Sequence, residues 1–80
     1  MKWGVKIMPR EVLLDSQGRA VENLLKENNF QLTQCRIGRY AEITTQQASE
    51  EKAREEIQKM AQFVLYNPLI ETFTIERLNP

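Results

Sequence analysis

Near both ends of the sequence, apolar and polar residues alternate, as they do along a strand with one buried face. In residues 2–8 the alternation places Trp3, Val5 and Ile7 on one face and polar residues or glycine between them. Residues 71–77 alternate in the same way. The pattern therefore predicts a half-buried strand near each end of the chain.

Between these strands, two stretches carry apolar residues at helical spacing. Those of the first stretch are Ala20, Val21, Leu24 and Leu25. Asp15 or Ser16 can cap the start of this helix, and Asn28 and Asn29 offer a stop. The first helix is therefore expected between residues 16 and 28.

The second helical stretch is longer and uninterrupted. Its apolar positions are Ala53, Ile57, Met60, Ala61, Val64 and Leu65, and they predict a helix that buries this stripe in the core. Ser49 is the predicted N-cap. Because Asn67 precedes Pro68 and is pushed out of helical geometry, we expect the helix to end near Tyr66.

The segment "QCRIGRYAEITT", residues 34–45, has the pattern of a strand that Gly38 interrupts. Odd positions are mostly apolar on both sides of Gly38, so a two-residue hairpin turn there would pair odd with even positions and mix the faces. Two possibilities remain: a three-residue turn over residues 38–40, or one strand of about twelve residues, roughly 40 Å long, bent at Gly38. We favour the bent strand, whose projecting half would offer an edge to a second subunit.

The order strand, helix, strand, helix, strand predicts one α+β domain over residues 1–80. We expect a ferredoxin-like two-layer sandwich in which two helices cover one face of an antiparallel sheet. The middle strand of that sheet would be long and bent at Gly38.

The size of the chain favours self-association. Eighty residues bury about 60–65% of their unfolded surface, which leaves a marginal monomer. Cys35 is the one cysteine and histidine is absent, so neither a disulfide nor a Cys/His zinc site can staple the fold. The lone thiol and the lack of a secretory or membrane pattern predict a cytoplasmic protein.

Charge and composition argue against several classes of function. Eleven basic and eleven acidic residues cancel, so no overall field attracts nucleic acid or a membrane surface. Without histidine, the chain lacks the commonest general base and the usual Ser/His or Cys/His nucleophilic pairs. These features do not favour an enzyme that works unaided.

Three segments together resemble a known family. "LLDSQGRAVENLL" resembles the D-P-Q-G-x-A-[VI] helix start of the PurS family, and "CRIGRYAEI" resembles its V-R-x-G-K-x-[IL]-E-[IL] strand. "NPLIETFTIE" is similar to the closing segment of that family. The resemblance covers essentially the whole chain; the departures are Ser16 in place of proline and Arg39 in place of lysine.

The PurS family is the small subunit of phosphoribosylformylglycinamidine synthase, an ATP-dependent ligase of purine biosynthesis that uses glutamine as amide donor. The resemblance implies a non-catalytic accessory subunit that bridges a glutaminase subunit and a large synthetase subunit and assists ammonia transfer. It implies that this subunit binds no cofactor, whereas the complex uses ATP and magnesium. Self-association as a dimer or a tetramer is expected as well.

Seven residues are candidate contacts to a partner or to another copy: Asp15, Gln17, Gly18, Arg36, Gly38, Arg39 and Tyr40. No catalytic or metal-binding residue is assigned. Asp15 can also be a plain N-cap. Gly18 can serve packing within the chain or a subunit contact.

The roles of the two arginines and of Tyr40 stay open as well. Arg36, judged by itself, has the pattern of a surface residue. Arg39 has an odd position, so it needs a partner carboxylate or an outward bend of the chain. Tyr40 can be an interface aromatic or a covering residue over the sheet, and Cys35 is expected to be a small buried apolar residue.

Two different functions share this architecture. An ACT-like module that binds small molecules is the alternative to the accessory subunit. An RNA-binding sandwich is the third possibility. It would need exposed aromatic residues on neighbouring strands and a basic face, and the sequence gives evidence of neither.

Overall fold

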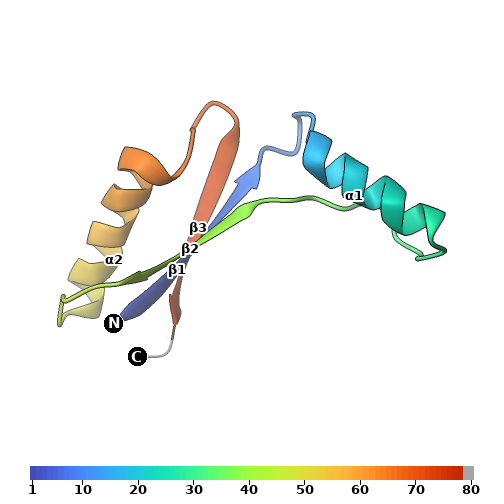
Figure 1. Cartoon of the computed structure of the whole chain (residues 1–80). Helices are drawn as coiled ribbons and strands as arrows, with labels where there is room; N and C mark the ends of the chain where they lie inside the picture. Colours follow the sequence, from blue (N-terminus) through green and yellow to red (C-terminus); the bar gives the residue numbers. More distant parts are fainter. Residues whose placement is uncertain (79–80) are drawn as a thin grey trace.

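A three-stranded antiparallel sheet forms the centre of the molecule (Figure 1). The computed structural model describes residues 1–78. Strand β1 (Lys2–Pro9) lies in the middle, with β2 (Arg39–Thr44) on one side and β3 (Glu71–Leu78) on the other. The two alternating stretches near the ends of the sequence are thus confirmed as strands, and they pair with each other.

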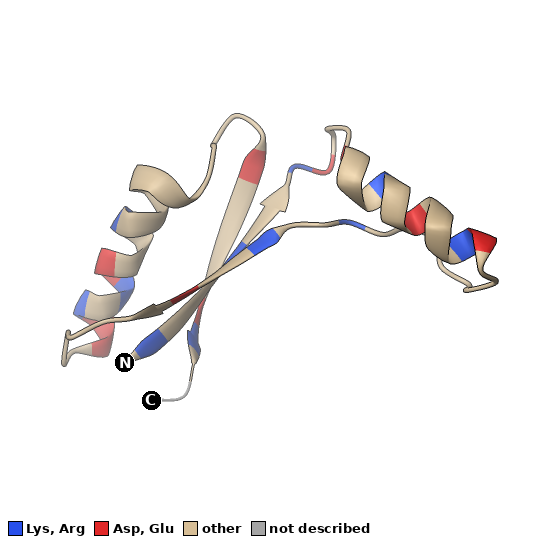
Figure 2. Cartoon of the chain, viewed as in Figure 1, with Lys and Arg blue, Asp and Glu red and all other residues tan. Residues whose placement is uncertain are grey.

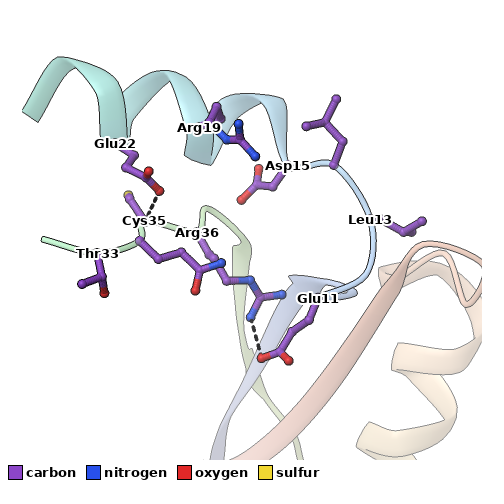
Figure 3. Close-up of a pocket in the computed structure, with 10 residues that line it drawn as sticks. Glu11, Leu13, Asp15, Arg19, Glu22, Thr33, Cys35 and Arg36 are labelled. Carbon is purple, nitrogen blue, oxygen red and sulfur yellow. Dashed lines mark hydrogen bonds and ion pairs between the residues drawn. The ribbon is translucent and has the colours of Figure 1, made fainter. Parts of the chain in front are cut away.

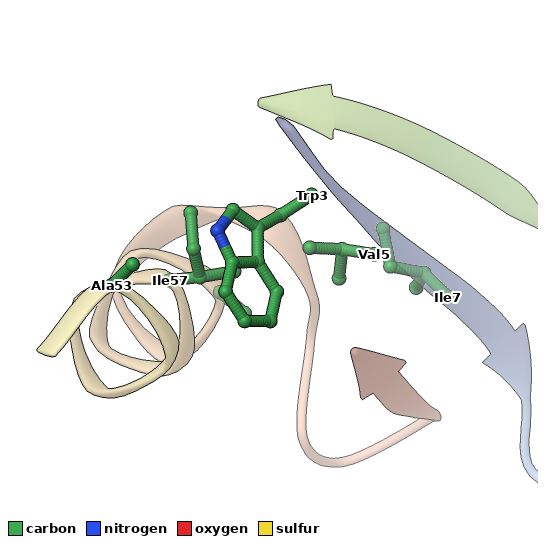
Figure 4. Close-up of a cluster of buried hydrophobic side chains, with 6 residues drawn as sticks. Trp3, Val5, Ile7, Ala53 and Ile57 are labelled. Atoms are coloured by element: carbon green, nitrogen blue, oxygen red, sulfur yellow. The ribbon is translucent and has the colours of Figure 1, made fainter. Parts of the chain in front are cut away.

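Helix α2 (Glu50–Met60) covers one face of the sheet and builds the core with β1 (Figure 4). The fully buried apolar residues among residues 1–78 are Trp3, Val5, Ile7, Ala53, Ile57 and Ala61. Ser49 caps α2 as predicted, because its side chain accepts a hydrogen bond from the amide of Lys52. The guanidinium of Arg54 lies 4.9 Å from the centre of the Trp3 ring and covers it.

The last turn of this helix differs from the prediction. Residues Ala61–Leu65 form a π-helical turn, η1. A π turn holds more residues than an α turn, so the side chains after Ala61 no longer follow α-helical spacing: Leu65 packs against the core, whereas Val64 does not. Val64 is 71% exposed, and its predicted place in the core is wrong. The predicted end is confirmed, since Tyr66 is extended.

Helix α1 (Ser16–Glu27) lies beyond the sheet (Figure 1). Together with its two connections to the sheet it forms an extended arm, residues 10–38, which we call the arm. The α+β ferredoxin-like class is confirmed, but in this chain α2 covers the sheet and α1 does not lie beside it. The radius of gyration is 15.7 Å, whereas a compact domain of this length has roughly 12 Å.

The ends of α1 are those that the sequence predicts, yet its apolar stripe is only partly covered within the chain. Asp15 is the N-cap and Asn28 the C-cap, and Asn29 has a positive φ of 69°. Gly18 is the buried residue of the helix, Val21 and Leu25 are half-buried, and Leu24 remains 59% exposed. Because a helix of this length is marginal in water by itself, α1 depends on its contacts to residues 35–37 and leaves part of its stripe for another surface.

The middle strand is regular over the second half of the predicted stretch. Arg39, Tyr40 and Ala41 pair one after another with β1, which excludes a turn over residues 38–40. The chain runs on from β2 toward α1 without reversing (Figure 1). Residues 34–38 are not in a strand, because no strand of residues 1–78 lies beside them to complete a ladder.

Candidate functional site

The candidate site is the junction, where the arm joins the ends of β1, β2 and β3. A cavity of about 210 Å³ lies there, and its walls are formed by Pro9, Leu14, Asp15, Ser16, Gln17, Ile37, Gly38, Arg39 and Glu71. Asp15, Gln17, Gly38 and Arg39 were predicted as contact residues from two separate motifs. The fold therefore brings the two motifs to one place.

Asp15 connects the start of α1 to residues 28–38, which lead from α1 back to the sheet and which we call the returning segment. One carboxylate oxygen accepts a hydrogen bond from the amide of Gly18 at 2.9 Å, and the other accepts one from the amide of Ile37 at 2.9 Å. These two bonds, and then the charge of Arg36, hold the pKa of Asp15 below its ordinary value. The N-cap interpretation is confirmed, and the carboxylate has a second role in addition.

Glu22 makes a matching contact two positions earlier in the returning segment. Its carboxylate accepts a hydrogen bond from the amide of Cys35 at 2.9 Å (Figure 3). It also accepts one from the ammonium of Lys26 at 3.0 Å. The hydrogen bond from the Cys35 amide, followed by that from Lys26, lowers the pKa of Glu22 below its ordinary value. Sequence reasoning did not single out Glu22, because its bond to Cys35 joins residues 13 positions apart.

Amides of residues two apart point to the same edge of an extended segment. The amides of Cys35 and Ile37 are in this relation, and they meet the carboxylates of Glu22 and Asp15. Two acidic side chains of α1 thus take the place that carbonyl groups of a neighbouring strand would have. The amide groups on this edge of the returning segment are therefore hydrogen-bonded, although no strand pairs with it.

Gly18 lets α1 come close to that segment. It is buried, and a Cβ atom at this position would lie 2.7 Å from the carbonyl oxygen of Cys35 and closer still to the carboxylate of Asp15. Of the two interpretations that the sequence left open, the structure supports packing within the chain. Contact of Gly18 with another subunit remains a prediction.

Arg36 joins the returning segment to the segment that leaves β1. Its guanidinium donates to the carbonyl oxygen of Pro9 and lies 3.8 Å from a carboxylate oxygen of Glu11 (Figure 3). The side chain is 24% exposed, so Arg36 is more than a plain surface residue. Gly38 is close by, where a Cβ atom would meet the carbonyl oxygen of Ile7. Close approach to β1 thus explains this glycine.

Arg39 finds the carboxylate that its position requires. Its guanidinium donates to both oxygens of Glu71, at 2.7 and 2.9 Å, and to the carbonyl oxygen of Leu65 at 3.0 Å. Glu71 also accepts a hydrogen bond from the amide of Asn67 at 2.8 Å. Arg39 first and this amide second lower the pKa of Glu71 below its ordinary value. Glu71 is distant in the sequence, and although it lies within the segment "NPLIETFTIE", the sequence did not single it out as a contact residue.

Arg10, which the sequence reasoning missed, is a second arginine that binds the loop between η1 and β3. The backbone amide of Arg10 donates to the carbonyl oxygen of Ile70 at 2.9 Å, and its guanidinium donates to that of Pro68 at 2.7 and 3.1 Å. The loop between η1 and β3 is therefore fixed by arginines from two different segments. A basic residue just after a strand was the one available signal.

Tyr40 does not belong to the junction. It lies on the face of the sheet opposite to α2, where its hydroxyl end rests against Gly4 and donates to Glu76 at 3.0 Å. Desolvation, followed by the hydrogen bond with Glu76, raises the pKa of Tyr40 above its ordinary value. The covering interpretation therefore fits the structure, and a partner contact through the half-exposed ring remains a prediction.

A second cavity, of about 420 Å³, lies between α1 and the returning segment (Figure 3). Cys35 is half-buried at its wall, rather than fully buried as expected. The acidic groups Asp15 and Glu22 at the wall are bonded to backbone amides, and Arg36 is bonded to a carbonyl. Such contacts hold chain segments in place.

The described part of the chain shows neither a metal centre nor a membrane span. In residues 1–78 no cluster of three or more His, Cys, Asp or Glu side chains is arranged to hold a metal ion. No helix in the same range is long and apolar enough to cross a membrane. Charges of both signs are interspersed along α1 and α2 (Figure 2).

Large apolar side chains are exposed on the arm, on β2, on η1 and on the loop before β3. They are Val12, Leu13, Leu14, Leu24, Phe30, Tyr40, Phe63, Val64, Leu69 and Ile70. A small protein rarely leaves so much apolar surface in water unless something covers it. The geometry therefore describes an interaction surface.

Comparison with known proteins gives consistent matches over nearly the whole chain. A family model described as PurS, phosphoribosylformylglycinamidine (FGAM) synthase, matches residues 2–79. The chain is 32% identical over 68 residues to phosphoribosylformylglycinamidine synthase subunit PurS of Synechocystis sp., an alignment that covers 84% of this chain and 68% of that protein.

Solved structures agree with this match. The chain is similar to PurS of B. subtilis, with 30% identity, a TM-score of 0.81 and 94% of each chain covered. It also shares its fold with a chain in the structure of PurLQS from Thermotoga maritima, with 24% identity, a TM-score of 0.91 and coverage of 96% and 95%. An arm extended away from the sheet is thus compatible with experimental structures.

Proposed function

The chain belongs to the PurS family of phosphoribosylformylglycinamidine synthase, and we propose that it serves this synthase as a non-catalytic assembly subunit. Its partners are a glutaminase subunit and a large synthetase subunit, which it bridges so that ammonia passes between them. The similarity to a chain of the Thermotoga maritima PurLQS structure supports such an assembly. An ACT-like module is not favoured.

One observation carries the proposal: the functional residues at the junction hold backbone segments, and they leave an apolar arm exposed. Asp15 and Glu22 bind amides of the returning segment, and Arg39 binds Glu71 and a carbonyl. Each of these side chains is thus engaged in contacts within the chain. The chemistry, with ATP and magnesium, belongs to the other subunits in this proposal, and the cytoplasmic location goes with the pathway.

Self-association is part of the proposal. Helix α1 leaves part of its apolar stripe exposed, Leu24 above all, and residues 34–38 have no strand beside them within residues 1–78. A second copy can offer a strand edge to residues 34–38 and a sheet surface to the stripe of α1. In a two-fold arrangement, each chain would supply these contacts to the other. We therefore propose a homo-oligomer, in which the arm is the region of contact.

The test is reconstitution with the glutaminase and synthetase subunits from the same organism. We expect glutamine-dependent synthesis to require the chain, while synthesis from added ammonia proceeds without it. The chain alone should hydrolyse neither ATP nor glutamine. Full glutamine-dependent activity in its absence would contradict the assembly role, and turnover by the pure chain would contradict the non-catalytic role.

A further inference from the structure

The arm is held away from the sheet although its connections are long enough to fold back. Residues 10–15 can span about 20 Å and residues 28–38 about 36 Å when extended, whereas α1 itself is about 18 Å long. Covalent length therefore does not fix α1 at its observed place. The contacts within the arm must do so.

Those contacts bind α1 to the returning segment rather than to the sheet. Glu22 and Asp15 accept the amides of Cys35 and Ile37, each at 2.9 Å. Gly18 permits the close approach, because a side chain there would collide with the carbonyl oxygen of Cys35. The result is a single unit made of a helix and an extended segment.

Glu22 can be separated from the other members of this unit. Asp15 also caps α1 through the amide of Gly18, so its removal would weaken the helix itself. Glu22 lies inside the helix and caps nothing, and alanine at that position favours a helix at least as well. Its bond to the amide of Cys35 is therefore the contact whose loss can be studied by itself.

We infer that Glu22 is a positioning residue for assembly: it keeps the arm rigid and so presents the apolar stripe of α1, already ordered, to a second copy. The inference rests on the self-association proposed above. A preformed surface associates more tightly, because less conformational entropy is lost on binding. Removal of the tie should therefore loosen the arm first and weaken the oligomer as a consequence.

The experiment compares Glu22→Ala with Glu22→Gln, which can still accept the amide, and with Lys26→Ala. The lysine variant is the matched control, since it removes the helix ion pair and leaves the acceptor for Cys35. Sedimentation measures self-association, and amide hydrogen exchange compares Cys35 in the arm with Val5 in the sheet. Far-UV circular dichroism monitors the fold.

We expect Glu22→Ala to speed exchange at Cys35, to leave Val5 unchanged and to weaken self-association about tenfold. Glu22→Gln and Lys26→Ala should stay near the wild type. A glutamine variant as weak as the alanine variant, or an alanine variant that associates normally, would overturn the inference while the homo-oligomer stands. A wild-type chain that remains monomeric would overturn the homo-oligomer, and this inference with it.

Discussion

Arg39 and Glu71, which are 32 positions apart, form a two-point ion pair that joins the first residue of β2 to the first residue of β3. The same guanidinium reaches the carbonyl oxygen of Leu65 at the end of η1. One side chain therefore fixes how the last turn of the helix layer meets the sheet. All three contacts are donated by one terminal nitrogen, Nη2, which a lysine ammonium can replace in part.

Replacement of Arg39 by alanine should lower the thermal midpoint by about 2–5 °C, since the side chain is 58% exposed and solvent screens the pair. Arg39→Lys should recover part of the loss. Differential scanning calorimetry at fixed protein concentration measures both. The same midpoint for wild type and Arg39→Ala would show that the pair contributes nothing to stability.

Stability should fall in acid. The pKa values of Asp15, Glu22 and Glu71 lie below their ordinary values of 3.8, 4.5 and 4.5. A carboxyl whose pKa is lower in the folded state contributes stability above its unfolded pKa, and this contribution is lost as the pH falls through the folded pKa. Urea midpoints should thus be flat from pH 7 to about 5.5 and decrease below about pH 4.5.

The triple variant Asp15→Asn, Glu22→Gln and Glu71→Gln tests this assignment. Its urea midpoint should be lower at neutral pH and should change less with acid than that of the wild type. An equally steep acid loss in the triple variant would assign the effect to other carboxyl groups.

Gly38→Val should damage the junction more than the helices. A side chain at this position would meet the carbonyl oxygen of Ile7 and the sulfur of Met8, at an estimated cost of about 1–3 kcal/mol. Helical circular dichroism should persist, while a higher concentration of the chain is needed to restore glutamine-dependent synthesis. Gly4→Val is a useful comparison, because it displaces Tyr40 on the opposite face. Full activity of Gly38→Val at wild-type concentration would contradict the close-approach explanation.

Leu24→Ser should weaken the homo-oligomer without a loss of monomer stability, since Leu24 is 59% exposed in the single chain. Val64→Ser, at a position 71% exposed on the other helix, is the matched control. The readout is the dependence of the sedimentation coefficient and of the thermal midpoint on concentration. If Leu24→Ser associates like the wild type, the stripe of α1 is not the contact.

Local signals in the sequence predicted the elements well. Alternation identified β1 and β3, Asp15 and Ser49 were recognised as caps, and Asn28 as a stop. Each of these features depends on a few neighbouring residues, so each can be seen without the fold. The π-helical turn was missed, because a stripe at α-helical spacing does not show where the spacing changes.

The placement of α1 could not be predicted from its pattern. An amphipathic stripe indicates that one face must be covered, but it does not say which surface covers it. The bonds from Glu22 to Cys35 and from Glu71 to Arg39 depend on the same long-range arrangement. The motifs marked the right neighbourhood, since Asp15 and Gly38 line the same cavity, while their bonding partners required the structure.

Because acidic side chains already occupy one edge of residues 34–38, this stretch can accept a strand along its other edge alone. An exposed strand with two open edges is a hazard, since copies can add on both sides and grow into fibres. In the proposed homo-oligomer, residues 34–38 therefore have one edge left for pairing, so Asp15 and Glu22 restrict strand addition at this stretch to one side.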